Sequence, residues 1–192
     1  YGSGASFTME DGEIYNNHAL KGTNNGWNPV FYVYGNGTTF VMNGGSIHSN
    51  SSTMVSAIGN NGSNATVKLN GGSISNNSST SGLFGDDLYL YCDGTIGKDM
   101  TVGDVRSYGD LTVNGGVTGN AYLYGGSTTI SSTGSITGDV TLKNGTTLNN
   151  SGTITGNITM YIPAGDKLNN YYTNNGTHVG ELIVYYTVTA EY

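Results

Sequence analysis

Hydrophobic and polar residues alternate in three short segments of this chain that share one pattern. The segments are FTMEDGEIYNN from Phe7, FVMNGGSIHSN from Phe40 and VKLNGGSISNN from Val67. In each copy two apolar residues lie two positions apart, a turn containing glycine follows, and one isoleucine stands between the turn and a closing asparagine. Alternation with a period of two, interrupted by glycine turns, predicts short strands that meet at corners.

The three copies predict a solenoid, in which each unit buries its apolar side chains by stacking on the next. They begin at residues 7, 40 and 67, so 33 and 27 residues separate equivalent positions. Copies separated by unequal insertions are typical of coils joined by variable loops. If the copies stack in register, the closing residues Asn17, Asn50 and Asn77 form an internal ladder whose amides bond to neighbouring coils and to the backbone.

The repeat becomes shorter after residue 95. Four segments begin 21, 19 and 18 residues apart: IGKDMTV (96–102), VTGNAYL (117–123), ITGDVTL (136–142) and ITGNITM (154–160). Each places a polar pair between one apolar residue and an alternating pair, and Lys98-Asp99 is the polar pair of the first. Leu111, Ile130 and Leu148 each precede this motif by six residues, which predicts a further column of equivalent positions.

We therefore predict a single all-β domain over residues 1–192, a right-handed, single-stranded parallel β-helix of about seven to nine coils with almost no α-helix. Residues 1–95 are expected to form longer coils with loop insertions, and residues 96–168 short regular coils. Residues 169–192 are expected to form a polar loop and a closing strand. Because a repeat is already under way at Phe7, we expect the chain to be a fragment of a larger protein.

The composition agrees with a solenoid and disfavours several partners. Glycine accounts for 32 of 192 residues, but regularly placed Ile, Val, Leu and Met distinguish the chain from a disordered one. The net charge is −7 and Arg106 is the single arginine. Nucleic acid and anionic membrane surfaces are poor partners, because both require clustered Lys and Arg. The chain has no run of about 18 apolar residues, so we expect no membrane insertion of this segment.

The copies FVMNGGSIHSN and VKLNGGSISNN, followed by GDDLYLYCDGTI from Gly85, resemble the Asn-Gly-Gly-x-Ile-Ser-x-Asn repeats of bacterial surface β-helix proteins. These are large, adhesin-like proteins, secreted or anchored to the wall. The resemblance covers about residues 5–100 and is weaker beyond them. It implies a right-handed parallel β-helix, an extracellular location at the cell surface and a role as a stalk or adhesive region. We also expect flanking domains in the same chain. The resemblance implies no chemistry, because the repeated motif consists of packing and turn positions.

Tyrosine is the most informative surface residue, since it occurs 15 times against 4 Phe and 1 Trp. Where neighbouring leucines face the core, alternating tyrosines face outward, and rows of exposed rings suit stacking on sugars or a protein interface. Alternatively, the tyrosines have high strand propensity and cover the sheet against loops. Trp27 lies in an insertion and either binds a ligand or packs onto the coil. The candidate ligand-binding residues are Tyr89, Tyr91, Tyr122, Tyr124, Trp27, Tyr32 and Tyr34.

Parallel β-helices also include polysaccharide lyases and hydrolases, which need paired carboxylates, or acids that hold calcium beside a basic residue. The candidate acids are Asp86, Asp87, Asp93, Asp99 and Asp104. Each also fits a corner residue that caps backbone amides, and no stacked Asp-x-Asp or His-Gly pattern accompanies them. We therefore predict no enzymatic activity, no catalytic residue and no cofactor. Structural calcium at Asp86, Asp87 and Asp93 is a weaker alternative.

Other candidate chemistry is sparse. His18, His48 and His178 lie too far apart in the sequence to predict a shared metal site, and His48 occupies the position of Tyr15 and Ser75 in the other copies. A lone Cys92 without a nearby histidine predicts a small packed side chain rather than a nucleophile.

Ice binding is a third function class, because some β-solenoids present flat rows of outward threonines. A partial row is predicted from Thr128-Thr129, Thr146-Thr147, Thr153 and Thr155, and we expect Tyr122, Tyr124, Lys143 and Tyr161 to interrupt it. The sequence therefore favours a stalk or adhesion module whose partner is a host glycan or an extracellular protein.

Overall fold

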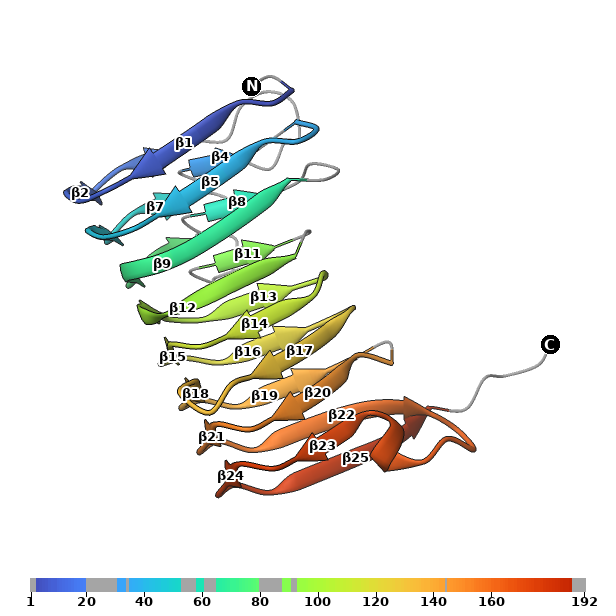
Figure 1. The fold of residues 1–192 in the computed structure, drawn as a ribbon. Coiled ribbons are helices and arrows are strands. Elements are labelled where there is room, and N and C mark those ends of the chain that lie inside the picture. Colours follow the sequence, from blue (N-terminus) through green and yellow to red (C-terminus); the bar gives the residue numbers. More distant parts are fainter. Residues whose placement is uncertain are drawn as a thin grey trace.

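The computed structural model is a stack of short strands that follow one another in successive coils (Figure 1). It describes residues 3–19, 31–33, 35–52, 58–60, 65–79, 88–90, 93–143 and 145–187, with the backbone alone at 31–33, 59–60 and 79. Within these ranges all strand pairs are parallel, and the helical element is a short 3-10 turn, η1 (Leu168–Asn170). The protein is nearly all-β, and its parallel strands form a nearly closed, solenoid-like arrangement.

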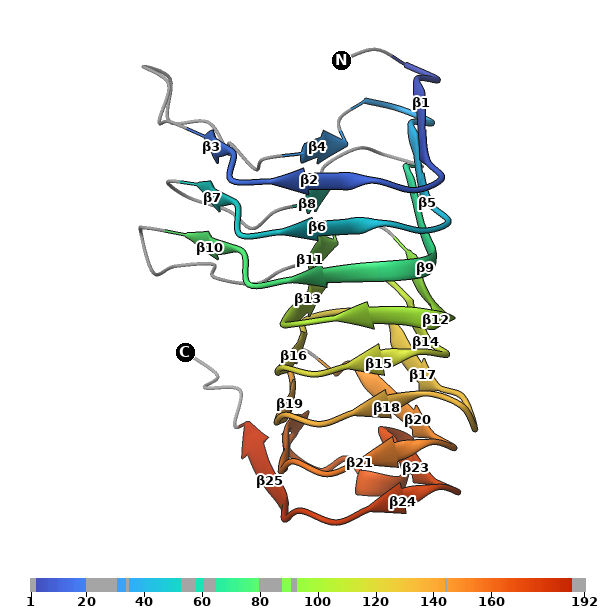
Figure 2. The same ribbon diagram turned by 90° about the vertical axis from the view of Figure 1, so that its left-hand side faces the viewer.

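The described strands form three sheets, which we call the large sheet, the short sheet and the eight-stranded sheet (Figure 2). The large sheet contains β1 (Ser6–Met9), β2 (Glu13–Tyr15), β5 (Thr39–Met42), β6 (Ser46–His48), β9 (Thr66–Ser75), β12 (Gly94–Val102), β14 (Leu111–Val113), β15 (Gly116–Val117), β17 (Ser127–Ile130), β18 (Ser135–Ile136), β20 (Thr147–Asn150), β21 (Thr153–Ile154), β23 (Tyr172–Asn174) and β24 (Thr177–His178). The short sheet contains β3 (His18–Ala19), β7 (Ser51–Ser52) and β10 (Ser78–Ser79). The eight-stranded sheet contains β4 (Phe31–Val33), β8 (Ile58–Asn60), β11 (Leu88–Leu90), β13 (Val105–Ser107), β16 (Ala121–Leu123), β19 (Val140–Leu142), β22 (Ile158–Pro163) and β25 (Leu182–Thr187).

The three N-terminal copies stack in register, as the sequence pattern predicts. Their equivalent residues are Cα partners in three columns: Phe7, Phe40 and Val67; Met9, Met42 and Leu69; and Ile14, Ile47 and Ile74. Side chains at alternate positions of these strands point inward, and Ile47 and Ile74 are completely buried. The apolar alternation thus lines a narrow core along the stack, which is how a solenoid buries hydrophobic surface without a helix.

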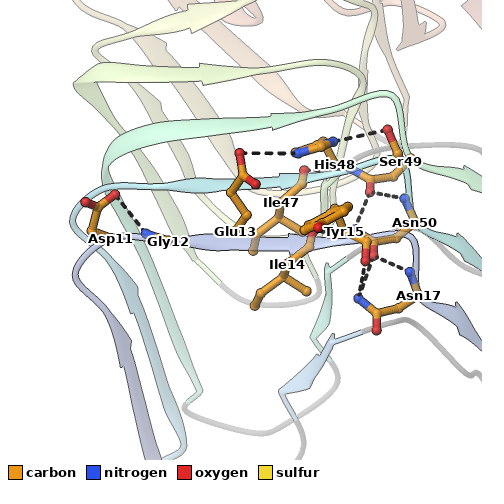
Figure 3. Close-up of polar contacts among 11 residues, drawn as sticks. Asp11, Gly12, Glu13, Ile14, Tyr15, Asn17, Ile47, His48, Ser49 and Asn50 are labelled. Carbon is orange, nitrogen blue, oxygen red and sulfur yellow. Dashed lines mark hydrogen bonds and ion pairs between the residues drawn. The ribbon is translucent and has the colours of Figure 1, made fainter.

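The predicted asparagine ladder is confirmed, and Figure 3 shows its first step. The backbone N–H and the side-chain amide of Asn17 donate to Asn50 Oδ1 at 3.0 and 2.9 Å. Asn50 repeats both bonds to Asn77 Oδ1, at 3.1 and 2.9 Å. Asn50 Nδ2 also donates to the Ile14 carbonyl oxygen at 2.9 Å. These amides therefore bond to backbone groups at the bend as well as joining neighbouring coils.

The coils change width along the stack. The short sheet extends the first three coils on one side, as Figure 2 shows, and the chain leads from β12 onward directly into the eight-stranded sheet. A second ladder fixes this narrower corner. The backbone N–H groups of Asn120, Asp139, Asn157 and Glu181 each donate to the side-chain oxygen of the equivalent residue one coil earlier, 16, 19, 18 and 24 residues away, beginning at Asp104.

Two alignments predicted for the shorter coils are wrong. Lys98-Asp99 is not the first polar pair of the corner, because Val102 pairs with Val117 and Asp104 takes the corner position. The six-residue spacing holds for Leu111 and Leu148, which both pair with the buried Thr128 and so share a column. It fails for Ile130, which pairs with Val113 and Asn150 instead. The cause is unequal turns, since residues 114–115 link β14 to β15 but residues 131–134 link β17 to β18.

The C-terminal segment is more regular than predicted. The expected polar loop of residues 169–180 contains β23 and β24, which pair with β20 and β21. The β25 strand pairs along its whole length with β22. Residues 172–187 therefore continue the coil pattern. In this last coil Asn174 and His178 occupy columns that hold Val113 and Val117 earlier in the stack.

Candidate functional site

The outer face of the eight-stranded sheet carries a row of equivalent residues, here called the tyrosine column. Its members directly follow β13, β16 and β19 or lie within β22 and β25: Tyr108, Tyr124, Lys143, Tyr161 and Tyr185. Each follows an inward residue of its strand, and Leu123, Leu142 and Met160 among these are at most 1 % exposed. Alternation along the strands therefore directs the column outward.

The members of the tyrosine column touch one another from coil to coil. The rings of Tyr108 and Tyr124 stack with centroids 5.0 Å apart, and those of Tyr161 and Tyr185 with centroids 5.1 Å apart. The Lys143 ammonium lies between the two pairs, 5.7 Å from the Tyr124 ring centroid and 5.2 Å from that of Tyr161. Stacking and cation–π contacts thus hold the rings in one line along the stack.

A second outward row lies beside the tyrosine column and includes Arg106 and Tyr122, which are Cα partners. The Arg106 guanidinium lies 4.9 Å from the Tyr122 ring centroid and 5.3 Å from that of Tyr124. Its Nη1 also donates to the Tyr124 hydroxyl at 3.0 Å. Two of the six basic residues of an acidic chain therefore lie on this one aromatic face.

A groove of about 480 Å³ opens beside the C-terminal part of the column. Its lining combines column residues with residues of the neighbouring connections: Lys143, Gly145, Tyr161, Pro163, Tyr171 and Thr187. The Tyr171 ring closes one side over Gly145, where an added Cβ would lie 3.5 Å from the ring. Aromatic side chains, one cation and a hydroxyl group therefore converge on one hollow.

The Tyr171 side chain is oriented by Asp166, whose Oδ2 accepts a hydrogen bond from the tyrosine hydroxyl. This hydrogen bond raises the pKa of Tyr171, and desolvation and the negative charge of Asp166 act in the same direction. Burial raises the pKa of Tyr172, which packs edge-on against His178 with centroids 6.5 Å apart. Both tyrosines therefore remain neutral at neutral pH.

The structure separates the tyrosines that the sequence singled out. Tyr122 and Tyr124 lie half-buried on the outer face, in agreement with their predicted orientation. The prediction that Tyr89 is exposed is wrong, because it is only 1 % exposed and its ring lies 5.6 Å from that of Tyr108. This position matches the alternative in which tyrosines cover the sheet. Tyr32 is placed in β4 by its backbone alone, and Trp27, Tyr34 and Tyr91 lie outside the described residues.

The sequence pattern did not predict Tyr108, Lys143, Tyr161 and Tyr185 as candidate binding residues. A signal was present, since each column residue lies four positions after a corner residue of the second ladder: Asp104, Asn120, Asp139, Asn157 and Glu181. Misplacing the first corner at Lys98-Asp99 hid this spacing.

Two of the acids considered for catalysis, Asp93 and Asp104, accept backbone N–H groups as corner aspartates do. Asp93 Oδ1 accepts the Asp110 backbone N–H at 2.9 Å, and Asp104 begins the second ladder. Asp99 lies 3.8 Å from Lys98 in an exposed ion pair. Asp86 and Asp87 lie outside the described residues, as does Cys92. Within the described part of the chain, no three His, Cys, Asp or Glu side chains are grouped closely enough to hold a metal ion.

The histidines occupy separate places. His48 aligns with Tyr15 and Ser75, as predicted, and its ring stacks on Tyr15 with centroids 5.5 Å apart. Figure 3 also shows His48 facing Glu13, with Nε2 3.9 Å from Oε1. His18 Nδ1 contacts the Ser51 hydroxyl at 2.5 Å, and His178 lies in the last coil.

The threonines are arranged differently from the predicted partial row. Thr128 and Thr146 are buried, so they belong to no surface ladder. A row on the large sheet instead runs through Cα partners Thr95, Thr112, Thr129, Asn149 and Thr173. The residues expected to interrupt the threonines, Tyr122, Tyr124, Lys143 and Tyr161, lie at the eight-stranded sheet, which is a different face.

In comparisons with known proteins, no protein family model, no curated protein and no solved structure matches this chain. Among the residues that the structure describes, no helix has the length and apolar character needed to cross a membrane.

Proposed function

We propose that this chain is a non-enzymatic stalk or adhesion module of an extracellular bacterial surface protein, and that it binds a host glycan through the tyrosine column. The observation that carries the proposal is the line of four tyrosine rings and two cations on one rigid face. Exposed aromatic rings contact the apolar faces of sugar rings while their hydroxyl groups remain wet. Stacked coils set such rings at a repeat of about 4.8 Å, which preorganises a binding surface.

The proposal also includes the handedness and the type of the solenoid. Successive parallel strands joined by crossover connections are right-handed in about 98 % of cases, which supports a right-handed, single-stranded parallel β-helix. The repeats that resemble those of bacterial adhesin-like proteins support the surface location, and the acidic charge of −7 argues against nucleic acid as the partner.

The test is binding of the purified chain to a glycan array, beside a panel of mucins and matrix proteins. A triple variant, Tyr124→Ser, Tyr161→Ser and Tyr185→Ser, removes the rings from three coils of the column. Tyr15→Ser is the matched control, because Tyr15 is 50 % exposed but lies on β2 of the large sheet. We expect saturable glycan binding that the triple variant loses and the control retains.

Two outcomes would contradict glycan binding through the tyrosine column. Binding that survives in the triple variant would place the adhesive face elsewhere. No binding to any surface at high protein concentration would leave the chain as a spacer. Thermal melting monitored by circular dichroism distinguishes loss of the binding contact from loss of the fold.

The threonine row favours ice binding as a second candidate function, because its members share one face without the tyrosines. Thr129 is the exposed centre of the row, between Thr112 and Asn149. Thermal hysteresis that disappears in Thr129→Lys would support this candidate, and its absence in the unmodified protein would reject it.

A further inference from the structure

The side chains that line the groove beside the tyrosine column favour one class of glycan over others. This inference rests on the glycan-binding function proposed above. The groove's volume of about 480 Å³ lies within the range of about 300–1,000 Å³ typical of small-molecule sites. Tyr161 and Tyr171 supply aromatic rings, Pro163 an apolar edge and Thr187 a hydroxyl group. These are the contacts that a sugar ring with one apolar face accepts.

Lys143 gives the groove a positive charge, which the neighbouring tyrosine rings do not neutralise. Its ammonium lies over the Tyr161 and Tyr124 rings. The ion pairs between described residues are His48 with Glu13 and Lys98 with Asp99, so no described carboxylate lies within 4.0 Å of Lys143. Asp166 does not line the groove, and its carboxylate accepts the Tyr171 hydroxyl. The half-buried cation is therefore available to an anion from outside the protein.

We propose that the groove binds a carboxylated sugar, with its carboxylate at Lys143 and its ring against Tyr161 and Tyr171. A neutral sugar uses the ring contacts but leaves the ammonium without an anionic partner. An acidic peptide uses the ammonium but has no sugar ring to stack. A carboxylated sugar makes both contacts, because its carboxylate pairs with the Lys143 ammonium while its ring packs against tyrosine.

The test uses a matched pair of probes, a short oligogalacturonate and its methyl ester, which share the sugar rings but differ in charge. Binding is measured by isothermal titration calorimetry with the whole chain. We expect the acid to bind at least about tenfold more tightly than the ester, since a charge-assisted hydrogen bond is worth more than a neutral one. Lys143→Gln should abolish this preference, whereas Lys68→Gln, the same change at an exposed site of β9, should retain it.

A second variant tests the groove without altering its charge. Thr187→Trp places a large ring at the exposed edge of the groove and should weaken binding of the acid about tenfold or more. Poly-glutamate should bind more weakly than the oligogalacturonate, because it lacks the ring contacts.

The outcomes separate this inference from the proposed function. Equal affinity for acid and ester, an unchanged preference in Lys143→Gln, or equal binding of poly-glutamate overturns the carboxylated-sugar site. If array binding still depends on the column in any of those cases, the proposed function stands. Absence of binding by every sugar on the array overturns both.

Discussion

Asn77 Oδ1 accepts two hydrogen bonds from Asn50, one from the backbone N–H at 3.1 Å and one from the side-chain amide at 2.9 Å. Asn50 is 1 % exposed, and its own Oδ1 accepts the same two bonds from Asn17. The ladder thus joins three coils through one buried side chain, whose removal leaves several polar groups without partners.

Asn50→Ala should lower the free energy of unfolding by about 3 kcal/mol, because a buried polar group left without its partner costs about 1–3 kcal/mol. Asn43→Ala is the matched control. Asn43 bonds across coils to Glu10 and Asn70 in the same way, but its side chain is exposed, so water replaces the lost bonds. Urea denaturation of both variants gives the comparison. Equal costs would show that the buried ladder has no special role.

Two adjacent glycines at one corner should differ in how much stability their replacement by alanine costs. A Cβ on Gly115 would overlap the carbonyl oxygens of Gly97 and Met100, whereas the nearest atom to a Cβ on Gly116 is the Ser135 hydroxyl oxygen at 3.8 Å. Gly115→Ala should therefore cost about 2 kcal/mol or more through forced backbone movement. Gly116→Ala should change stability by less than about 0.5 kcal/mol. Thermal and urea denaturation test both, and a tolerated Gly115→Ala would contradict the close coil contact.

The second ladder should depend on an acceptor oxygen and not on charge. Asp139 Oδ1 accepts the Asn157 backbone N–H at 2.8 Å, while amides occupy the same corner at Asn120 and Asn157. Asp139→Asn keeps an oxygen and should be nearly neutral. Asp139→Ala removes it and should cost about 1 kcal/mol. If both variants lose the same stability, the carboxylate charge matters and the acceptor explanation fails.

Tyr171 should ionise at lower pH once Asp166 is replaced. The hydrogen bond to the Asp166 carboxylate raises the pKa of Tyr171 above its ordinary value of 10.0. The contact therefore stabilises the fold below that pH and ceases to do so as pH rises through the pKa of the folded state. In Asp166→Asn the tyrosinate absorbance of one residue should appear at lower pH. Superimposable titration curves for the two proteins would rule out this coupling.

The solenoid core was predictable because its signal is local. Alternating apolar residues at Phe40 and Met42, a glycine turn and Ile47 recur in each copy, and a strand places alternate side chains on opposite faces. The asparagine ladder followed from the same repetition. Where turn lengths vary, as between β14 and β15 and between β17 and β18, counting residues gave the wrong columns, because register is set by hydrogen bonding between coils.

Repetition along the chain is enough to predict that parallel strands stack in coils, that Phe40, Ile47 and Ile74 line the core, and that Asn50 lies in a ladder. The arrangement of surface residues became clear from the stacked coils. Tyr89 is buried, Lys143 lies between Tyr124 and Tyr161, and the threonines lie on another face. The reason is physical. Core positions are fixed by period-two alternation within each strand, whereas neighbours on the surface come from different coils, and the length of every intervening turn decides which of them meet.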